Sequence, residues 1–391
     1  MDEPNSHPTG DVYGPEPAGR DHFDSLIRLV NLVLRSDSSR SMTEDFPFFL
    51  REENSDNLLV CRDGDRVVSH VGLLPTQASY FGHRVKIGMI GAVATHPDYR
   101  RRGLATRTLH EAFRRFRRQG GHLLMISGRR DLYFRNGARE VGSFLRYVLE
   151  RGAGSSGPDD ALQLEKAGVG RASEFAWLHR LKPLRFLRPL DEWTLRMGEG
   201  VCRNRLSEFC LARRDGEPTA YGIFRVEDND GSRDCIVTEW GGRPRDALLA
   251  VSRRVRQEDW SRSVWTLYPH ERHMADVLEQ CGARFEGCQA ADGSLRIANF
   301  PALMEALRGY LAELVGRRSA DALEFGDSGG DVFSIALGDE RARIEGYGKL
   351  AEVIFGTGLD ALPESLPDGR LRRTLSALLP LSPMNYDFSY A

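Results

Sequence analysis

The stretch that decides the fold is Gly91–Leu109, GAVATHPDYRRRGLATRTL. Its residues Val93–Thr95 close a run apolar enough for a buried strand, and His96–Tyr99 make a polar turn. Arg100–Gly103 then lead directly into a helix. Backbone N–H groups at the start of a helix have no partner within it and carry partial positive charge, so they bind phosphates. The stretch therefore predicts a pyrophosphate site, where arginines supply charge and glycine allows a close backbone approach.

The sequence on either side of this stretch has the pattern of a sheet covered by helices. The expected elements are an amphipathic helix from Phe23 to about Leu34, strands at residues 57–62, 66–75 and 85–95, a helix over about 103–119, and a buried strand at His122–Ser127. The strand at residues 85–95, VKIGMIGAVAT, is continuously apolar and is expected to be central. The order predicts an α/β fold with a mixed α+β sheet.

The composition excludes several classes of protein. The chain has 391 residues and a formal net charge of −2, so the whole protein is not an electrostatic binder of nucleic acid. No stretch approaches the roughly 20 apolar residues that span a bilayer, and the acidic, Pro/Gly-rich start lacks the apolar core of a signal peptide. Six cysteines contain no CxxC pair, and His270 and His273 lack a third ligand, so no metal site is predicted. We expect a cytoplasmic protein with reduced thiols and no membrane partner.

The segment Ile87–Gly142 resembles the core of the GNAT acyltransferase superfamily, whose cofactor motif is Q/R-x-x-G-x-G/A. Arg100, Gly103 and Ala105 match this motif, between a buried strand and an amphipathic helix as the mechanism requires. The resemblance implies acetyl-CoA as cosubstrate, with its pantetheine arm lying against the preceding strand like an extra strand. The resemblance implies Val93, Ala94 and Thr95 at the acetyl and pantetheine groups, and Arg101, Arg102, Gly103, Leu104, Ala105 and Thr106 around the pyrophosphate. The other implied cofactor-binding residues are Arg100 of the motif, and Ser127 and Gly128 at the end of the next strand.

A second match lies in RDLYFRNGAREVG, where Tyr133 and Gly137 fit the pattern Y-x-x-x-G that many GNAT enzymes carry. The resemblance implies that Tyr133 is the general acid that protonates the departing CoA thiolate. A phenol can do this only when it is held within hydrogen-bond reach of the sulfur. The simpler alternative is that Tyr133 is a packed aromatic residue at the start of a loop.

The general base is not evident from the central strand, because KIGMIGAVAT contains no carboxylate. His96, Asp98 and His70 are candidates near in sequence, each also consistent with a structural or surface role. The order and length of the units further resemble the enhanced intracellular survival (Eis) type acetyltransferases. That resemblance implies two fused GNAT domains, a sterol-carrier-protein-like domain, a homo-oligomer such as a hexamer, and the C-terminal carboxylate, here that of Ala391, as the base.

Composition and resemblance together predict five segments. They are a disordered tail at residues 1–22, a GNAT domain at 23–150, a Gly/Ser/Pro linker at 151–160, a degenerate GNAT-like domain at 161–290, and a sterol-carrier-protein-like domain at 291–391. In the last segment, DVFSIALGDERARIEG is expected to form a hairpin that turns at Gly338-Asp339. In the middle segment, Pro244 and the missing R-x-x-G-x-A spacing make CoA binding unexpected.

Two functions remain open from the sequence. The first is an N-acetyltransferase that moves acetyl from acetyl-CoA to a primary amine, on a polyamine, an aminoglycoside-like molecule or a lysine. Direct attack by the amine needs no cysteine or serine nucleophile. The second is a non-catalytic acyl-CoA-binding or lipid-carrying sensor, favoured by the missing strand carboxylate. The complete cofactor motif together with Tyr133 favours the enzyme.

Overall fold

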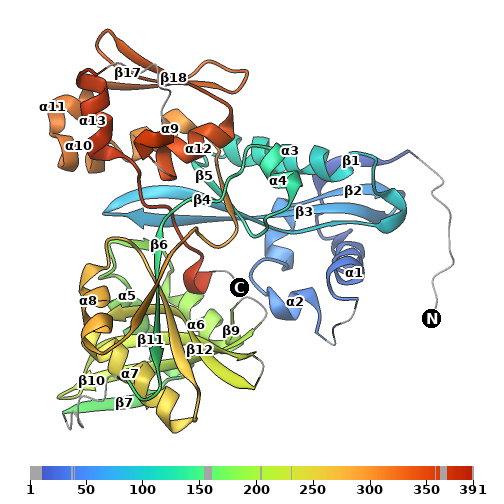
Figure 1. The fold of residues 1–391 in the computed structure, drawn as a ribbon. Coiled ribbons are helices and arrows are strands. Elements are labelled where there is room, and N and C mark those ends of the chain that lie inside the picture. Colours follow the sequence, from blue (N-terminus) through green and yellow to red (C-terminus); the bar gives the residue numbers. More distant parts are fainter. Residues whose placement is uncertain are drawn as a thin grey trace, which may run out of the picture.

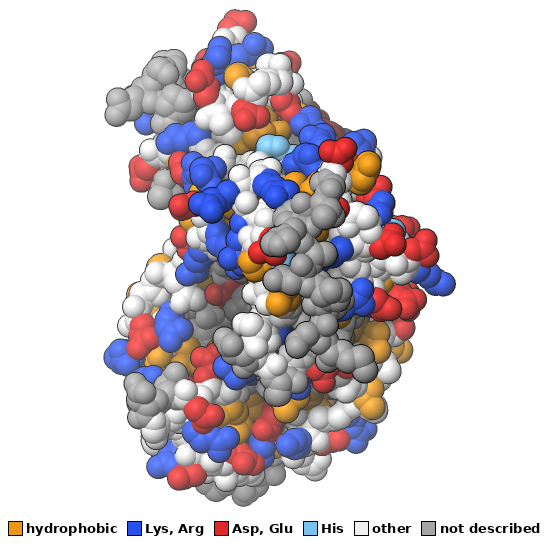
Figure 2. Space-filling view, turned by 90° about the vertical axis from the view of Figure 1, so that its right-hand side faces the viewer, with side chains coloured by type: hydrophobic (Ala, Val, Ile, Leu, Met, Phe, Trp, Pro, Cys, Tyr) orange, Lys and Arg blue, Asp and Glu red, His pale blue; other side chains and the backbone are white. Residues whose placement is uncertain are grey.

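The structure is a computed structural model that describes residues 11–36, 38, 40–153, 161–202, 205–229, 231–356, 358–361 and 368–389. Three sheets organise these residues, and helices pack on and between them (Figure 1). Charged side chains of both signs are interspersed on the face shown in Figure 2, in keeping with the small net charge. No helix in the described ranges combines the length and apolarity that crossing a membrane would require.

The first sheet has the strand order β1-β2-β3-β4-β5-β15, with β8 paired to β3. The strands are β1 (Tyr13–Pro17), β2 (Leu58–Asp63), β3 (Arg66–Tyr80), β4 (His83–Thr95), β5 (Leu123–Ile126), β8 (Leu184–Phe186) and β15 (Ser294–Ile297). Neighbours are antiparallel except for β4 and β5, which run parallel because a helix crosses between them. The mixed α/β sheet predicted from the sequence is therefore confirmed.

Two helices cover opposite faces of this sheet because their apolar stripes match its two faces. Helix α1 (Phe23–Leu34) buries Leu26, Leu29 and Val30 in the same cluster as Leu58 and Val60 of β2. Helix α3 (Leu104–Arg118) buries Leu109, Ala112, Phe113 and Phe116 in another cluster, together with Leu59, Val71 and Ile90. Side chains of a strand alternate between faces, so the two clusters lie on either side of the sheet. Both helices were predicted from their periodicity, and both are confirmed.

The second sheet has the order β14-β6-β13-β12-β11-β10-β7, with β9 paired to β10. Its strands are β6 (Phe144–Glu150), β7 (Leu162–Lys166), β9 (Val201–Cys202), β10 (Arg205–Arg214), β11 (Glu217–Asn229), β12 (Ser232–Gly242), β13 (Arg262–Leu267) and β14 (Arg284–Gln289). Only β12 and β13 are parallel, and α7 (Pro244–Gln257) crosses between them. Helices α5 (Ala172–His179), α6 (Leu190–Glu199) and α8 (Arg272–Gln280) complete this unit.

The two sheets exchange strands. Strand β6 precedes the predicted linker but pairs with β13 and β14 of the second sheet. Strand β15 follows the second unit but pairs with β5 of the first sheet, and β8 pairs with β3. Residues 154–160 of the predicted linker lie outside the described residues. The first two units are therefore interlocked by pairing that crosses from one to the other.

The third unit contains an antiparallel sheet of β16 (Leu323–Asp327), β17 (Val332–Leu337) and β18 (Glu340–Glu345). The hairpin predicted to turn at Gly338-Asp339 is confirmed as β17–β18. The helices of this unit are α9 (Phe300–Ala306), α10 (Arg308–Val315), α11 (Arg317–Asp321), α12 (Tyr347–Phe355) and α13 (Arg370–Leu378). Phe300, Phe333 and Leu350 belong to the same core cluster as Met89 of β4, so this unit packs directly on the first sheet.

The predicted disordered tail is wrong for residues 13–17. These residues form β1, which pairs antiparallel with β2 through Tyr13–Arg62, Glu16–Val60 and Pro17–Leu59. The Arg62 guanidinium also pairs with the Glu16 carboxylate. Pro/Gly content suggested disorder, but an edge strand tolerates proline because one side of it needs no ladder hydrogen bonds. Residues 1–10 of that prediction lie outside the described residues.

The chain ends in an extended segment that leaves the third unit. After α13, residues 379–386 have no regular structure, and Asp387–Ser389 form a 3-10 turn. Figure 1 shows this red segment running from the third unit past the first sheet to the second unit. Its side chains are largely buried, including those of Leu381, Met384, Tyr386 and Phe388. The segment therefore connects all three units.

Candidate active site

A gap opens in the first sheet where the parallel strands β4 and β5 diverge. The strands are paired from Ile87–Leu123 to Ile90–Ile126, and the last link is the hydrogen bond from the Ser127 N–H to the Ile90 carbonyl, 3.1 Å. Just beyond it, Ala92 has a φ of 51°, at a register shift between β3 and β4. Such a bulge bends a strand away from its neighbour and redirects its side chains. The divergence leaves backbone groups of both strands facing an open space.

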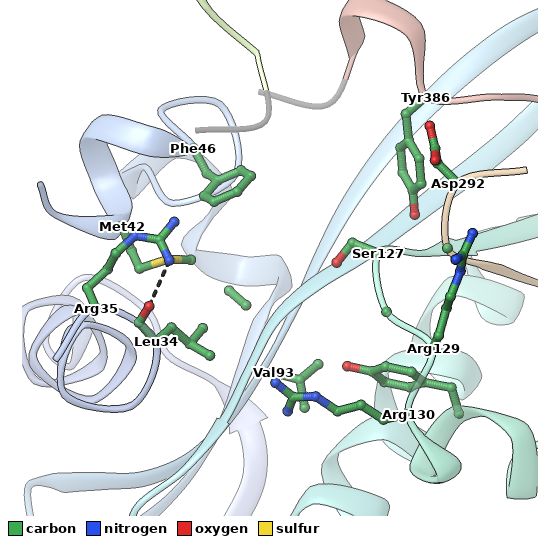
Figure 3. A pocket seen from close by; sticks show the side chains of 14 residues that line it. Leu34, Arg35, Met42, Phe46, Val93, Ser127, Arg129, Arg130, Asp292 and Tyr386 are labelled. Atoms are coloured by element: carbon green, nitrogen blue, oxygen red, sulfur yellow. Dashed lines mark hydrogen bonds between the residues drawn. The ribbon is translucent and has the colours of Figure 1, made fainter. Parts of the chain in front are cut away.

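A cavity of about 610 Å³ lies at this gap. It is lined by Leu34, Arg35, Met42, Phe46, Ala92, Val93, Ser127, Gly128, Arg129, Arg130, Tyr133, Asp292, Gly293 and Tyr386. The lining comes from α1, from α2 (Met42–Asp45), from the ends of β4 and β5, from α4 (Asp131–Arg135), from the loop before β15 and from the C-terminal segment. In Figure 3, Tyr386 and Asp292 lie on the side opposite Met42 and Phe46. The cavity thus sits between residues as far apart in the chain as Leu34 and Tyr386.

Tyr133 is held in the wall of this cavity by α4. Its ring lies against Gly128, where an added Cβ would come within 2.6 Å of the Tyr133 Cε2 atom. The side chain is only 4 % exposed, and burial raises the pKa of its phenol, an effect that the nearby Arg130 guanidinium opposes. A phenol with a raised pKa is protonated near neutral pH. Tyr133 is therefore in the state that a proton donor needs.

The arginine-rich loop follows β4 as the sequence predicts. Pro97–Tyr99 form a 3-10 turn, and Arg101 and Gly103 adopt left-handed φ angles of 63° and 72°. Gly103 is the N-cap of α3, with no side chain capping the first turn. The Arg101 and Arg102 side chains are exposed, and the Arg102 guanidinium lies 5.0 Å from the centre of the Tyr99 ring. The helix start therefore presents backbone donors and exposed cations to solvent, as phosphate binding requires.

The predicted cofactor residues fall into two groups. Val93, Ser127 and Gly128 line the cavity beside Tyr133. Ala94 does not line it, because its side chain is buried in the main core, and the Thr95 hydroxyl instead contacts that of Ser69 at 2.9 Å. The loop residues predicted around the pyrophosphate also lie outside the cavity lining, at or before the first turn of α3; they are Arg100, Arg101, Arg102, Gly103, Leu104, Ala105 and Thr106.

The histidines considered as bases do not line the cavity. His70 is fully buried, its Nδ1 lies 3.0 Å from the Leu59 carbonyl, and burial lowers its pKa to about 4. The Nε2 of His96 lies 2.8 Å from the Arg66 guanidinium, and its Nδ1 accepts from the Asp98 N–H. Burial, followed by the charge of Arg66, lowers the pKa of His96. His96 instead lines a separate cavity of about 280 Å³, and neither histidine belongs to the lining of the cavity beside Tyr133.

Most of the cavity wall opposite the gap is not indicated by the sequence. Leu34, Met42 and Phe46 supply an apolar surface, while Arg35 pairs with the buried Asp45 at 2.7 Å and Arg129 with Glu140 at 2.6 Å. The apolar periodicity of α1 predicts which face of the helix is buried. It does not indicate that the C-terminal end of α1 borders a cavity. Tyr386 lies 253 positions after Tyr133, and only the apolar, aromatic character of the C-terminal segment pointed to docking.

Side chains that could hold a metal ion do not gather anywhere in the described ranges. Within those ranges, no group of three or more His, Cys, Asp or Glu side chains is arranged to hold a metal ion. His270 packs against the rings of Phe81 and Tyr268, at 5.0 and 5.3 Å between centroids, while His273 is exposed. The Ala391 carboxylate, predicted as the base, lies outside the described residues.

One family model matches the part of the chain that builds most of the first sheet and borders the cavity. Residues 15–139 match the family model for the acetyltransferase (GNAT) domain. No curated protein matches the sequence significantly.

Solved structures extend the likeness in fold over nearly the whole chain. A GCN5-related N-acetyltransferase from Anabaena variabilis shares 15% identity, with a TM-score of 0.66 over 97% of this chain and 99% of that one. A GCN5-related N-acetyltransferase from Kribbella flavida shares 15% identity, with a TM-score of 0.64 over 97% and 98%. Eis1 from Mycobacterium abscessus shares 14% identity, with a TM-score of 0.63 over 97% and 99%. At these identities the likeness concerns the fold.

Proposed function

We propose, from the premise that residues 15–139 form a GNAT acetyltransferase domain, that this protein transfers an acetyl group from acetyl-CoA to a primary amine. The observation that carries the proposal is the buried Tyr133 side chain in the wall of a cavity at the gap between β4 and β5. The gap offers unpaired backbone groups to an extended pantetheine arm. The start of α3, with Gly103 and the exposed arginines, would hold the pyrophosphate.

The proposed reaction is a direct transfer. The neutral amine attacks the thioester carbonyl, and backbone N–H groups near Val93 stabilise the negative charge that develops on the carbonyl oxygen. As the carbon–sulfur bond breaks, the Tyr133 phenol donates its proton to the CoA thiolate. The amine nitrogen gives up a proton to a base. The products are an amide and free CoA, with no covalent intermediate on the protein.

For the base, we propose the Ala391 carboxylate. Tyr386, five residues before the end of the sequence, already lines the cavity. Because Asp387–Ser389 are bound by the second unit, this role requires Tyr390 and Ala391 to lead back toward the cavity, a reach of at most about 7 Å for two residues. The central strand supplies no carboxylate, and His70 and His96 are held elsewhere. Adding two residues after Ala391 should reduce kcat greatly; unchanged turnover would reject this role.

We further propose that the unit built on the second sheet is a degenerate GNAT domain. Its strands β10, β11 and β12, its crossing helix α7 and the parallel strand β13 repeat the order of β2, β3, β4, α3 and β5. Pro244 stands at the first position of α7, where the first unit has its glycine-capped helix start. The third unit, helices around a hairpin sheet, would correspond to a sterol-carrier-like domain. Homo-oligomeric assembly, such as a hexamer, and a cytoplasmic location remain predictions.

The test is release of free thiol from acetyl-CoA in the presence of polyamines, aminoglycosides, lysine and lysine peptides. Turnover on at least one amine, lost in Tyr133→Phe, is the expected result. The second candidate is a non-catalytic acyl-CoA sensor, which the absence of a strand carboxylate favours. Tight CoA binding with no thiol release on any amine would support the sensor and reject the enzyme.

A further inference from the structure

The second sheet has a gap at the same place as the first, and the protein's own C-terminal segment fills it. Strands β12 and β13 are paired from Asp234–Arg262 to Val237–Trp265 and then diverge. As in β4, a register shift lies beside the gap, here between Ile223 and Phe224 of β11. The 3-10 turn Asp387–Ser389 sits between the separated ends. The Phe388 N–H donates to Glu239 of β12 at 3.2 Å, and Asp387 accepts from the Tyr268 hydroxyl, after β13, at 3.1 Å.

A fully buried ion pair holds the polar side of this turn. The Arg188 guanidinium donates to both oxygens of the Glu239 carboxylate, one of them at 3.1 Å. The carboxylate also accepts from the Tyr221 hydroxyl at 2.8 Å. The same guanidinium donates through Nε to the Ser389 hydroxyl at 2.9 Å. A buried ion pair is favourable only when its remaining hydrogen-bonding groups have partners. The Ser389 hydroxyl and the Phe388 N–H supply such partners, so the turn and the ion pair stabilise each other.

An aromatic socket, formed by Phe209 and Trp193 of the second unit, binds the apolar side of the turn, which is the Phe388 ring. The Phe388 ring is fully buried and packs on Phe209 at 5.4 Å and on Trp193 at 6.1 Å between centroids. The Arg196 guanidinium donates to the Phe388 carbonyl at 3.4 Å. Both the side chain and the backbone of Phe388 are therefore bound by the second unit.

The bound turn fixes Tyr386 from both sides. Before it, the Asn385 N–H donates to the Tyr268 hydroxyl at 3.0 Å, and the Asn385 side chain accepts from the Asp292 N–H at 3.4 Å. After it comes Asp387, bound to the same Tyr268 hydroxyl. Tyr386 itself leaves the socket and lines the cavity of the first unit (Figure 3).

We propose that the second unit acts as a socket that positions the C-terminal segment, so that Tyr386 completes the acetyl-transfer cavity of the first unit. Phe388, Glu239 and Arg188 are positioning residues, because they act through the segment and none of them lines the cavity. A displacement of about 1 Å at a reacting centre can lower a rate roughly 100-fold. The inference rests on the proposed function and gives the second gap a role that needs no second CoA site.

The experiment compares two buried phenylalanines of the full-length protein. Phe388→Ala empties the socket, whereas Phe224→Ala removes an equally buried ring that packs on Trp260 in a different core cluster, away from the segment. Both leave a similar cavity, so both should lower thermal stability comparably. Two readouts follow: hydrogen exchange of peptides that cover residues 381–391, and kcat and KM for acetyl-CoA in the thiol-release assay.

We expect Phe388→Ala to raise exchange across residues 384–389 and to lower kcat roughly 10- to 100-fold, with KM for acetyl-CoA unchanged. Phe224→Ala should leave that exchange and kcat within about twofold of the parent. Increased exchange with unchanged kcat would overturn the positioning role. An equal fall of kcat in both variants, or unchanged exchange in Phe388→Ala, would overturn it as well.

Failure of the proposed function would look different. A parent protein that binds CoA but turns over no amine would reject the enzyme, while hydrogen exchange would still show whether Phe388 anchors the segment. Should Phe388→Ala not fold, Phe388→Leu removes the aromatic contacts with a smaller loss of volume. For that variant, the same two readouts decide in the same way.

Discussion

The two sheets contain the same opening between parallel strands, one open and one closed. Between β4 and β5 the opening leads to a cavity lined by Tyr133 and Val93. Between β12 and β13 it is occupied by Asp387–Ser389, bound to Glu239 and Tyr268. The open gap is bordered by Val93, Ser127, Gly128 and Tyr133, whereas the closed gap is lined by the buried ion pair of Arg188 and Glu239. A pair of diverging parallel strands can therefore bind either a ligand or a segment of the same chain. The side chains at the point of divergence determine which of the two is bound.

The largest effect is expected at the ion pair of the closed gap. Glu239→Ala leaves the Arg188 guanidinium fully buried without its main partner, which typically costs about 3–5 kcal/mol. Calorimetric unfolding measures the loss. The matched control is Glu165→Ala, which breaks partly exposed pairs with Arg171 and Arg213 and should cost much less. Equal losses in the two variants would contradict a structural role for the closed gap.

The second-largest effect is expected when the proposed proton donor, Tyr133, is removed from the gap between β4 and β5. Tyr133→Phe should lower kcat by roughly 100-fold, because general-acid catalysis contributes that much or more, and CoA binding should not change. Steady-state thiol release and CoA titration separate the two quantities. Tyr147→Phe removes a hydroxyl that donates to Glu279 in the second unit and should keep full activity. Full activity in Tyr133→Phe would remove the acid from the proposed mechanism.

Two glycines that precede the crossing helices α3 and α7 should differ in their effect on CoA binding. Gly103 has a φ of 72° and open space where a Cβ would stand, so Gly103→Ala should cost about 1 kcal/mol of stability and weaken CoA binding roughly 10-fold. In Gly242→Ala the new Cβ would lie 2.2 Å from the Thr219 carbonyl oxygen. That variant should lose stability and bind CoA normally. Melting temperature and CoA affinity are measured for both variants. Weaker CoA binding in Gly242→Ala would indicate that CoA binds between β12 and β13, which would contradict the assignment of the two gaps.

The smallest effect concerns pH. Burial raises the pKa of the Asp387 carboxyl to about 7, with Lys182 opposing the rise. The other charged groups that affect it are Glu239, Arg188 and Glu271. An acid with a raised pKa in the folded state holds its proton there while the unfolded chain releases it, so its contribution to stability declines as pH rises from about 4 to 7. Asp387→Asn removes this decline, so its advantage in melting temperature should grow between pH 5 and 7 and level off above 8. A constant difference would contradict the assignment.

The sequence predicted the elements whose signal is local. The apolar run of β4, the stripe of α3 and the loop between them follow from periodicity and helix-start chemistry, and Tyr133 follows from a short motif. Hydrophobic pattern also located the β17–β18 hairpin. Each of these needs only residues within one or two elements.

What could not be predicted depends on pairing between distant segments. A strand pattern does not state its partner, so β6 and β15 gave no sign that they would join the sheet of the other unit. From the sequence, Glu239 cannot be distinguished from any other polar residue in a strand. Its partners Arg188 and Phe388 lie 51 and 149 positions away, so no local pattern indicates the contacts. Tyr386 could be expected to dock, but its place opposite Met42 emerges only from the folded chain.

We propose that one gap of this protein binds CoA, while the other is occupied by Asp387–Ser389 of the chain itself. A crystal structure of the full-length protein with CoA, together with the binding stoichiometry from calorimetric titration, tests it most directly. This assignment of the two gaps predicts one CoA per chain, with its pantetheine arm between β4 and β5, its pyrophosphate at Gly103, and Asp387–Ser389 still bound between β12 and β13. A second CoA at β12 and β13, or displacement of the C-terminal turn by the bound molecule, would contradict it.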